Sequence, residues 1–276
     1  MPLHLQSLTN DYQDHDLLTS LLMLATENPD GFLVTEDKYL LSRYALSDEP
    51  SGMPFGSLVI TMKVCDEENV IRILDLDITL ENESRTVLHF LEMRDGSSDS
   101  NEYYEAETEK DGSHLELETV CRHAIRDSLS DSVRDVSISA FPFQLSVFED
   151  IEAFNQWAGF DKEINVKGMD FYVHGFSEHF IMPGSAQRMM KEDDEIFSFL
   201  LGKVDSWKEI RWKIGDRELE FVIIRLDTAL GTIPVAAGRE VFDLSGLAKG
   251  AIIAMSADIK ADLSRPGDFV VSQSTQ

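Results

Sequence analysis

The sequence has few cysteines and no long apolar run. Cys65 and Cys121 are the two cysteines in 276 residues, which is too few for a disulfide framework and is typical of a reducing compartment. Both lie in apolar segments, so we expect buried free thiols and a cytoplasmic location. No stretch of 18 apolar residues occurs, and the N-terminus lacks a basic segment followed by an apolar one. We therefore expect neither a membrane span nor a secretory signal.

Positive charge is also scarce. The chain has 24 Lys and Arg residues against 51 Asp and Glu residues, a net charge of -27. Residues 180–276 have a net charge of -3, so residues 1–179 have -24. Such a surface repels phosphate backbones, and we do not expect it to bind duplex nucleic acid. It would attract a basic protein partner or cations, although a surface that only improves solubility is the simpler explanation.

Hydrophobic periodicity predicts three helices and many strands. The segment 14–27 has an apolar helical face with Asp14 as N-cap, and 149–159 is a short helix that ends at Gly159. The strongest helical pattern runs from Ser113 to Leu129, because Ser113 and Glu116 form a capping box. The acidic segment 95–113 is expected to be a long loop. Strands are expected at residues 31–35, 38–46, 57–64, 70–80, 86–93, 136–148 and 164–176.

These elements predict an α+β fold with two domains. Residues 1–180 would form an acidic domain, a mostly antiparallel sheet with two or three helices on one face. Residues 195–264 contain five β-rich runs separated by turns, which predict a small all-β barrel. Its strand number and spacing resemble an oligonucleotide/oligosaccharide-binding (OB) barrel, a likeness of fold alone. Residues 265–276 would form a flexible tail.

Two aspartates in the segment 70–80 face the same way. Asp75 and Asp77 alternate with Leu74, Leu76 and Ile78, which is the pattern of a strand with one buried face and one wet face. Paired carboxylates can perform acid–base chemistry when their environments separate their pKa values. A solvated sheet face is the commoner explanation and the one we expect.

Motifs for nucleophilic catalysis and phosphate binding are absent, because the chain has no Gly-x-Ser-x-Gly elbow and no P-loop. Metal binding has one candidate, His174, Glu178 and His179, which could meet if the chain folds back at Gly175. The alternative is ordinary polar side chains at a strand end. The acidic loop 95–113 could hold calcium, but Ser100 stands where an EF-hand requires glycine.

Aromatic and basic residues alternate near the start of the predicted barrel. Trp207, Arg211 and Trp212 could form a stacking platform for a ligand such as single-stranded nucleic acid. At a two-residue period, however, Trp212 shares a face with Ile210 and Ile214, so this face is better explained as core.

The sequence favours a non-enzymatic protein that binds a protein partner and uses no cofactor. A basic surface on that partner would complement the acidic surface of this chain. One alternative is a hydrolase or a metal- or ligand-binding enzyme with its site between the two domains, using His174, Glu178 and His179. A second alternative is binding of single-stranded nucleic acid or oligosaccharide by the C-terminal barrel.

Overall fold

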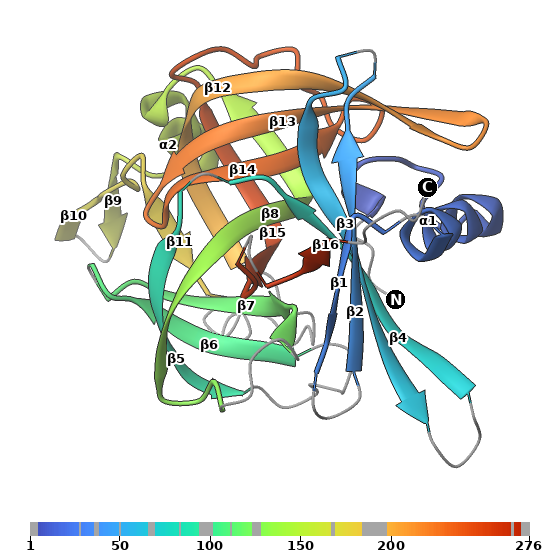
Figure 1. Ribbon diagram of the computed structural model, residues 1–276. Coiled ribbons are helices and arrows are strands. Elements are labelled where there is room, and N and C mark those ends of the chain that lie inside the picture. The colour runs from blue at the N-terminus through green and yellow to red at the C-terminus, as the bar shows by residue number, and fades with distance from the viewer. Residues whose placement is uncertain are drawn as a thin grey trace.

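The computed structural model describes residues 5–271 (Figure 1). The exceptions are residues 28, 36–38, 50, 66–69, 83, 94–101, 111, 123–127, 167–168, 184–197 and 266–267. The helices are η1 (Leu5–Ser7, a 3-10 turn), α1 (His15–Glu27) and α2 (Ile151–Ala158). The strands are β1 (Gly31–Val34), β2 (Tyr39–Ser47), β3 (Pro54–Cys65), β4 (Val70–Leu80), β5 (Thr86–Met93), β6 (Glu102–Thr108), β7 (His114–Val120), β8 (Ser132–Phe148), β9 (Lys162–Val166), β10 (Met169–Val173), β11 (Phe180–Met182), β12 (Ser198–Ile214), β13 (Arg217–Thr228), β14 (Gly231–Gly238), β15 (Ile252–Asp262) and β16 (Val270–Val271).

The fold is mostly β, so the α+β prediction is wrong. The predicted helices at residues 14–27 and 149–159 are present as α1 and α2. The Asp14 carboxylate accepts hydrogen bonds from the backbone N–H groups of Asp16 (2.8 Å) and Leu17 (3.2 Å) at the start of α1. Asp150 caps α2, which ends at Gly159 in the left-handed conformation (φ 78°). No described helix is long and apolar enough to cross a membrane.

The strongest predicted helix, residues 113–129, is the largest error. Its first half is strand β7, in which Leu115 and Leu117 point into the core. Glu116 and Glu118 are buried on the other side of the same strand, so polarity does not mark an exposed face. Because polar residues do not alternate with the buried side of the strand, the two-residue period of β7 cannot be recognised, and the spacing of its apolar residues favours a helix. Residues 123–127 of this segment lie outside the described part.

The predicted loop 95–113 contains a strand as well. In β6 the side chains of Tyr104, Ala106 and Thr108 are buried, and those between them are half-buried. The high acid content of this segment conceals its alternation. The candidate calcium position at Ser100 lies outside the described residues.

The nine-stranded sheet closes on itself twice. Its order is β11-β12-β13-β14-β8-β15-β7-β6-β5, with further pairings of β12 with β15 and of β8 with β5. Strands β12, β13, β14, β8 and β15 thus form one closed ring, and β8, β15, β7, β6 and β5 form a second. The two rings share β8 and β15, and they lie one above the other in Figure 1. One continuous core fills both rings, from Phe90 to Val222.

The small barrel was predicted from residues 195–264 alone, but the corresponding ring also contains strand β8. The first two predicted runs are one long strand, β12, and β8 lies between β14 and β15. Residues 132–148 therefore complete this ring. The division into domains near residues 180–195, and the likeness to an OB barrel, stay predictions.

A five-stranded sheet in the order β16-β1-β2-β3-β4 packs on the rings and makes contacts on both of its faces. One face, with Leu58, Ile60 and Leu76, packs on α1 and on the outer side of β12 and β13. On the other face, Leu41 and Val59 contact Val120 and Cys121 after β7. Buried ionisable side chains also lie at this second interface.

Candidate functional site

Four ionisable side chains meet between the five-stranded sheet and the second ring. Asp75 and Asp77 come from β4, Glu118 comes from β7 and Lys260 comes from β15. Exposed fractions are 4% for Asp75, 3% for Asp77, 1% for Glu118 and 0% for Lys260. We call these four residues the buried charge cluster.

The prediction of a wet face for Asp75 and Asp77 is wrong. From Asp75 to Leu80 both faces of β4 are buried, and Asp77 on the second face contacts Lys260 of β15. Lys260, which makes this burial tolerable, is 183 residues from Asp77 in the sequence. No local pattern in residues 70–80 indicates so distant a counter-charge, so a solvated face was the natural interpretation.

Lys260 holds the cluster together. Its ammonium donates to the Asp77 carboxylate and lies 3.4 Å from a carboxylate oxygen of Glu118. Burial alone would lower the pKa of Lys260, but the negative charges of Asp77 and Glu118 outweigh it and raise the pKa above the usual value. Lys260 is therefore a charged ammonium at neutral pH.

Asp75 has the opposite character. Burial, followed by the negative charge of Asp77, raises the pKa of Asp75 to about 9. One of its oxygens accepts a hydrogen bond of 2.9 Å from the backbone N–H of Leu76. At neutral pH Asp75 is therefore a neutral acid that lies beside a charged Lys260 ammonium.

The cluster has the spacing of a cation site, but an ammonium already occupies it. Asp75, Asp77 and Glu118 each offer a carboxylate oxygen, and these oxygens lie within 4.8 Å of one another. Lys260 supplies the positive charge there. Three surface cavities, of about 500, 680 and 160 Å³, are lined by other residues. The geometry is that of a structural junction between two β layers.

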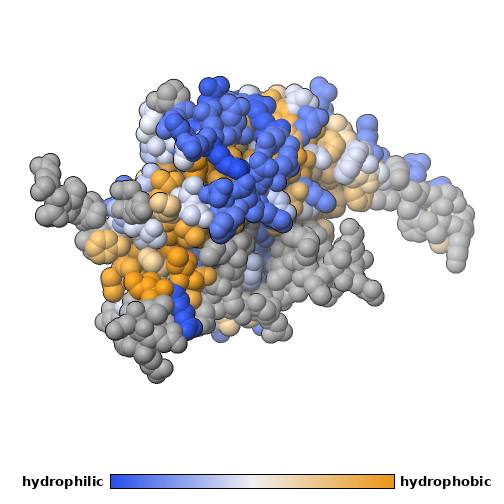
Figure 2. Space-filling model, turned by 90° about the vertical axis from the view of Figure 1, so that its right-hand side faces the viewer, coloured by the Kyte–Doolittle hydropathy of each residue, from blue (hydrophilic) through white to orange (hydrophobic). Residues whose placement is uncertain are grey.

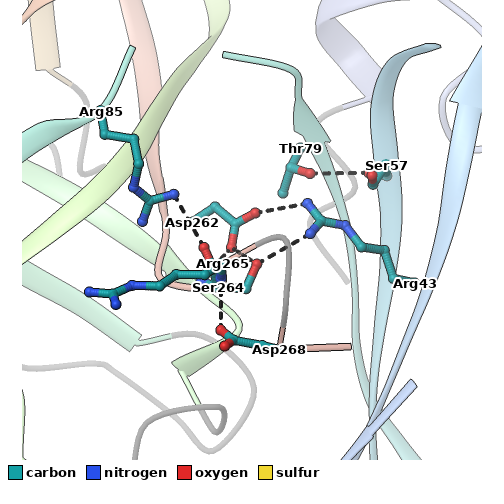
Figure 3. A network of polar contacts seen from close by, with 8 residues as sticks. All are labelled: Arg43, Ser57, Thr79, Arg85, Asp262, Ser264, Arg265 and Asp268. Carbon is teal, nitrogen blue, oxygen red and sulfur yellow. Dashed lines mark hydrogen bonds and ion pairs between the residues drawn. The ribbon is translucent and has the colours of Figure 1, made fainter. Parts of the chain in front are cut away.

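A second polar network extends the same interface (Figure 3). Arg43 of β2 makes an ion pair of 3.1 Å with Asp262 at the end of β15, and it donates to the Ser264 hydroxyl at 3.4 Å. Ser264 donates in turn to Asp262 through both its backbone N–H and its hydroxyl. Arg85 donates to the Ser264 carbonyl at 3.3 Å. This network fixes the chain end of β15 to β2.

The thiol of Cys121 lies in the same layer. Burial, followed by the negative charge of Asp262, raises the pKa of Cys121 well above its usual value. The prediction of a buried free thiol is confirmed for Cys121, and the side chain of Cys65 lies outside the described part. Cys121 is unsuited to nucleophilic chemistry, which requires an accessible thiolate.

The predicted metal ligands have separate partners. Glu178 pairs with Lys203 at 3.1 Å, and His179 lies 3.4 Å from Asp227. The His174 ring packs edge-on against Tyr172 instead, with ring centroids 4.9 Å apart. Gly175 lies against Asn155, and a Cβ built there would be 2.3 Å from the Asn155 side chain. The fold does not bring the three side chains together.

The predicted stacking platform is divided between two environments. Trp212 is 3% exposed and packs edge-on against Phe55, so it belongs to the core. Trp207 is 41% exposed, and Arg211 pairs with Glu220 at 3.2 Å on the surface. One tryptophan of the pair is thus accessible to a ligand and the other is not.

An exposed tryptophan that the sequence analysis missed lies on α2. Trp157 is 70% exposed, the largest exposed fraction of the described tryptophans. Its ring contacts Phe148 and Phe154, at centroid distances of 5.4 and 6.1 Å. The available signal was a tryptophan in a predicted helix, residues 149–159, whose first residues include Glu149, Asp150 and Glu152.

Comparison with protein-family models, with curated proteins and with solved structures finds no match to this chain.

Proposed function

We propose that the protein acts by binding a protein partner with a basic surface. The observation that carries this proposal is the location of the negative charge. The described carboxylates that are buried are Asp48, Asp75, Asp77, Glu116, Glu118 and Asp262. The other described carboxylates are half-buried or exposed, so most of the acidic excess faces the solvent, where it can attract a basic surface.

Surface cations do not neutralise this excess. Several of them are already paired, as Arg211 is with Glu220, Lys249 with Asp205 and Arg239 with Glu209. With 51 acidic and 24 basic residues, the chain retains a net charge of -27 after such pairing. The face beside α1 combines hydrophilic and hydrophobic surface (Figure 2), which is the mixture that protein interfaces use.

The chemically unusual groups support binding over catalysis. A catalytic carboxylate or lysine must touch its substrate, whereas the buried charge cluster is covered on both sides by β layers. The perturbed pKa values of Asp75 and Lys260 accordingly fit a structural role.

A defined basic probe tests the proposal. A fluorescently labelled peptide of about 12 residues, rich in Lys and Arg, should bind at low salt and weaken steeply between about 50 and 300 mM NaCl, because salt screens exposed charges. A Glu-rich peptide of the same length is the control and should not bind. If the basic peptide does not bind at the lower salt concentration, the proposal is wrong.

A further inference from the structure

We propose that α2, together with the described residues that follow it to β10, forms the docking surface for a Lys- or Arg-rich segment of a partner protein, with Trp157 as its anchor. This inference rests on the proposed function, and it assigns that function to one place on the molecule. It is carried by the exposure of Trp157, by the support beneath its ring and by the charge of the surrounding segment.

The segment 149–182 is an excursion from the rings. It leaves β8, forms α2 and then the two-stranded β9–β10 hairpin, and returns through β11, which pairs with β12. The hairpin forms a sheet of its own, and Figure 1 shows it standing away from the rings on the side of α2. An excursion of this kind adds surface without adding to the core of the rings.

Aromatic packing fixes α2 to the outer side of the rings. Phe154 is 2% exposed and clusters with Leu201, Ile252 and Ala254. Its ring is also near those of Phe148, Phe176 and Phe199. The Asn155 side chain of α2 also exchanges hydrogen bonds of 3.1 and 2.9 Å with the backbone of Phe176, in the chain that follows the helix. The helix is therefore held at both its apolar face and its C-terminal end.

Trp157 lies at the margin of this aromatic cluster. One part of its ring rests on Phe148 and Phe154, and 70% of the side chain faces solvent. A large exposed ring supported by a fixed helix loses little conformational freedom on binding. Tryptophan is also among the residues that most often dominate interface energies. Elsewhere in the excursion, Met169 and Tyr172 of β10 are 60% and 52% exposed.

Charge determines which partner suits this surface. Residues 149–182 contain seven Asp and Glu residues and two Lys residues, a net charge of -5 with His neutral. Glu149 and Glu152, at the start of α2, are exposed. An indole face attracts an ammonium or guanidinium group by a cation–π interaction, and nearby carboxylates strengthen that preference. The surface therefore fits a basic segment better than an apolar or acidic one.

Substitution of the anchor tests the inference with the labelled basic peptide described above. Trp157→Ala should weaken binding at least about tenfold, as expected for an anchoring residue. Trp207→Ala is the matched control, since Trp207 is also exposed, at 41%, but lies on β12. It should leave the affinity within about twofold. Trp157→Leu keeps apolar contact with Phe148 and Phe154 and loses only the aromatic face, so it should also bind weakly while unfolding at the wild-type temperature.

Charge variants provide an independent measurement. Glu149→Gln with Glu152→Gln should weaken binding a few-fold and reduce its dependence on salt. Asp150 is left unchanged because it caps α2.

The outcomes separate this inference from the proposed function. If the peptide binds wild type and Trp157→Ala equally, the basic partner remains and the docking surface is wrong. If it binds neither, the proposed function fails first. A mass that rises with concentration in wild type and not in Trp157→Ala would show that a second copy occupies this surface. Binding to neutral phosphatidylcholine vesicles that is lost with Trp157 would show a lipid surface as the occupant. Either result would overturn the inference.

Discussion

Two lysine–aspartate pairs in this molecule have the same chemistry and opposite surroundings. In the pair of Lys260 and Asp77 the side chains are 0% and 5% exposed, whereas in the pair of Lys249 and Asp205 they are 77% and 52% exposed. Water can replace either partner of the exposed pair. In the buried pair, each charge depends on the other, because desolvation makes an isolated charge costly. The comparison predicts that an ion pair contributes to stability in this molecule according to how deeply it is buried.

Removing each lysine should give the largest contrast. Lys260→Met leaves Asp77 and Glu118 buried without a counter-charge, and we expect a loss of about 3–5 kcal/mol in the free energy of unfolding. Lys249→Met, the matched control, should change it by less than about 0.5 kcal/mol. Urea denaturation of both variants at pH 7 measures the difference. Equal losses would show that Lys260 has no special structural role.

Asp75 and Asp77 provide a second contrast, within one strand. Because the folded pKa of Asp75 is about 9 and the usual value is 3.8, the folded state holds a proton that the unfolded state lacks between these pH values. Stability from this group is complete below about pH 4 and falls as pH rises to about 9. Lys260, with its raised pKa, stays charged throughout this window.

Asp75→Asn cannot ionise, so the variant should be increasingly more stable than wild type from about pH 4 to 9. The difference can grow by at most about 1.4 kcal/mol for each pH unit. Asp77→Asn, in contrast, removes a counter-charge of Lys260 and should destabilise the fold at every pH in this range. Denaturant midpoints measured across the range would show the two opposite trends, and parallel profiles for Asp75→Asn and wild type would contradict the assignment.

Local sequence patterns predicted the elements whose polarity marks one exposed face. The helix after Asp14, the helix that ends at Gly159 and the core position of Trp212 all have such marks. The charge cluster was not predictable in this way, because Glu118 and Lys260 are polar residues on buried faces and their partners are distant in sequence. For the same reason, the segment that forms β7 was wrongly predicted to be a helix. Where two β layers pack through charged side chains, hydrophobic periodicity no longer reports which face is buried.

Arg43 and Asp262 test an intermediate position, since their side chains are 25% and 9% exposed. Arg43→Met keeps much of the apolar stem and removes the ion pair and the hydrogen bond to Ser264. We expect a loss of about 1–2 kcal/mol, between those of Lys260→Met and Lys249→Met, because water reaches Arg43 and because Ser264 still donates twice to Asp262. Urea denaturation of the three variants under one set of conditions gives the order. A loss for Arg43→Met as large as that for Lys260→Met would mean that connection between the layers, rather than exclusion of water from the charges, determines the cost.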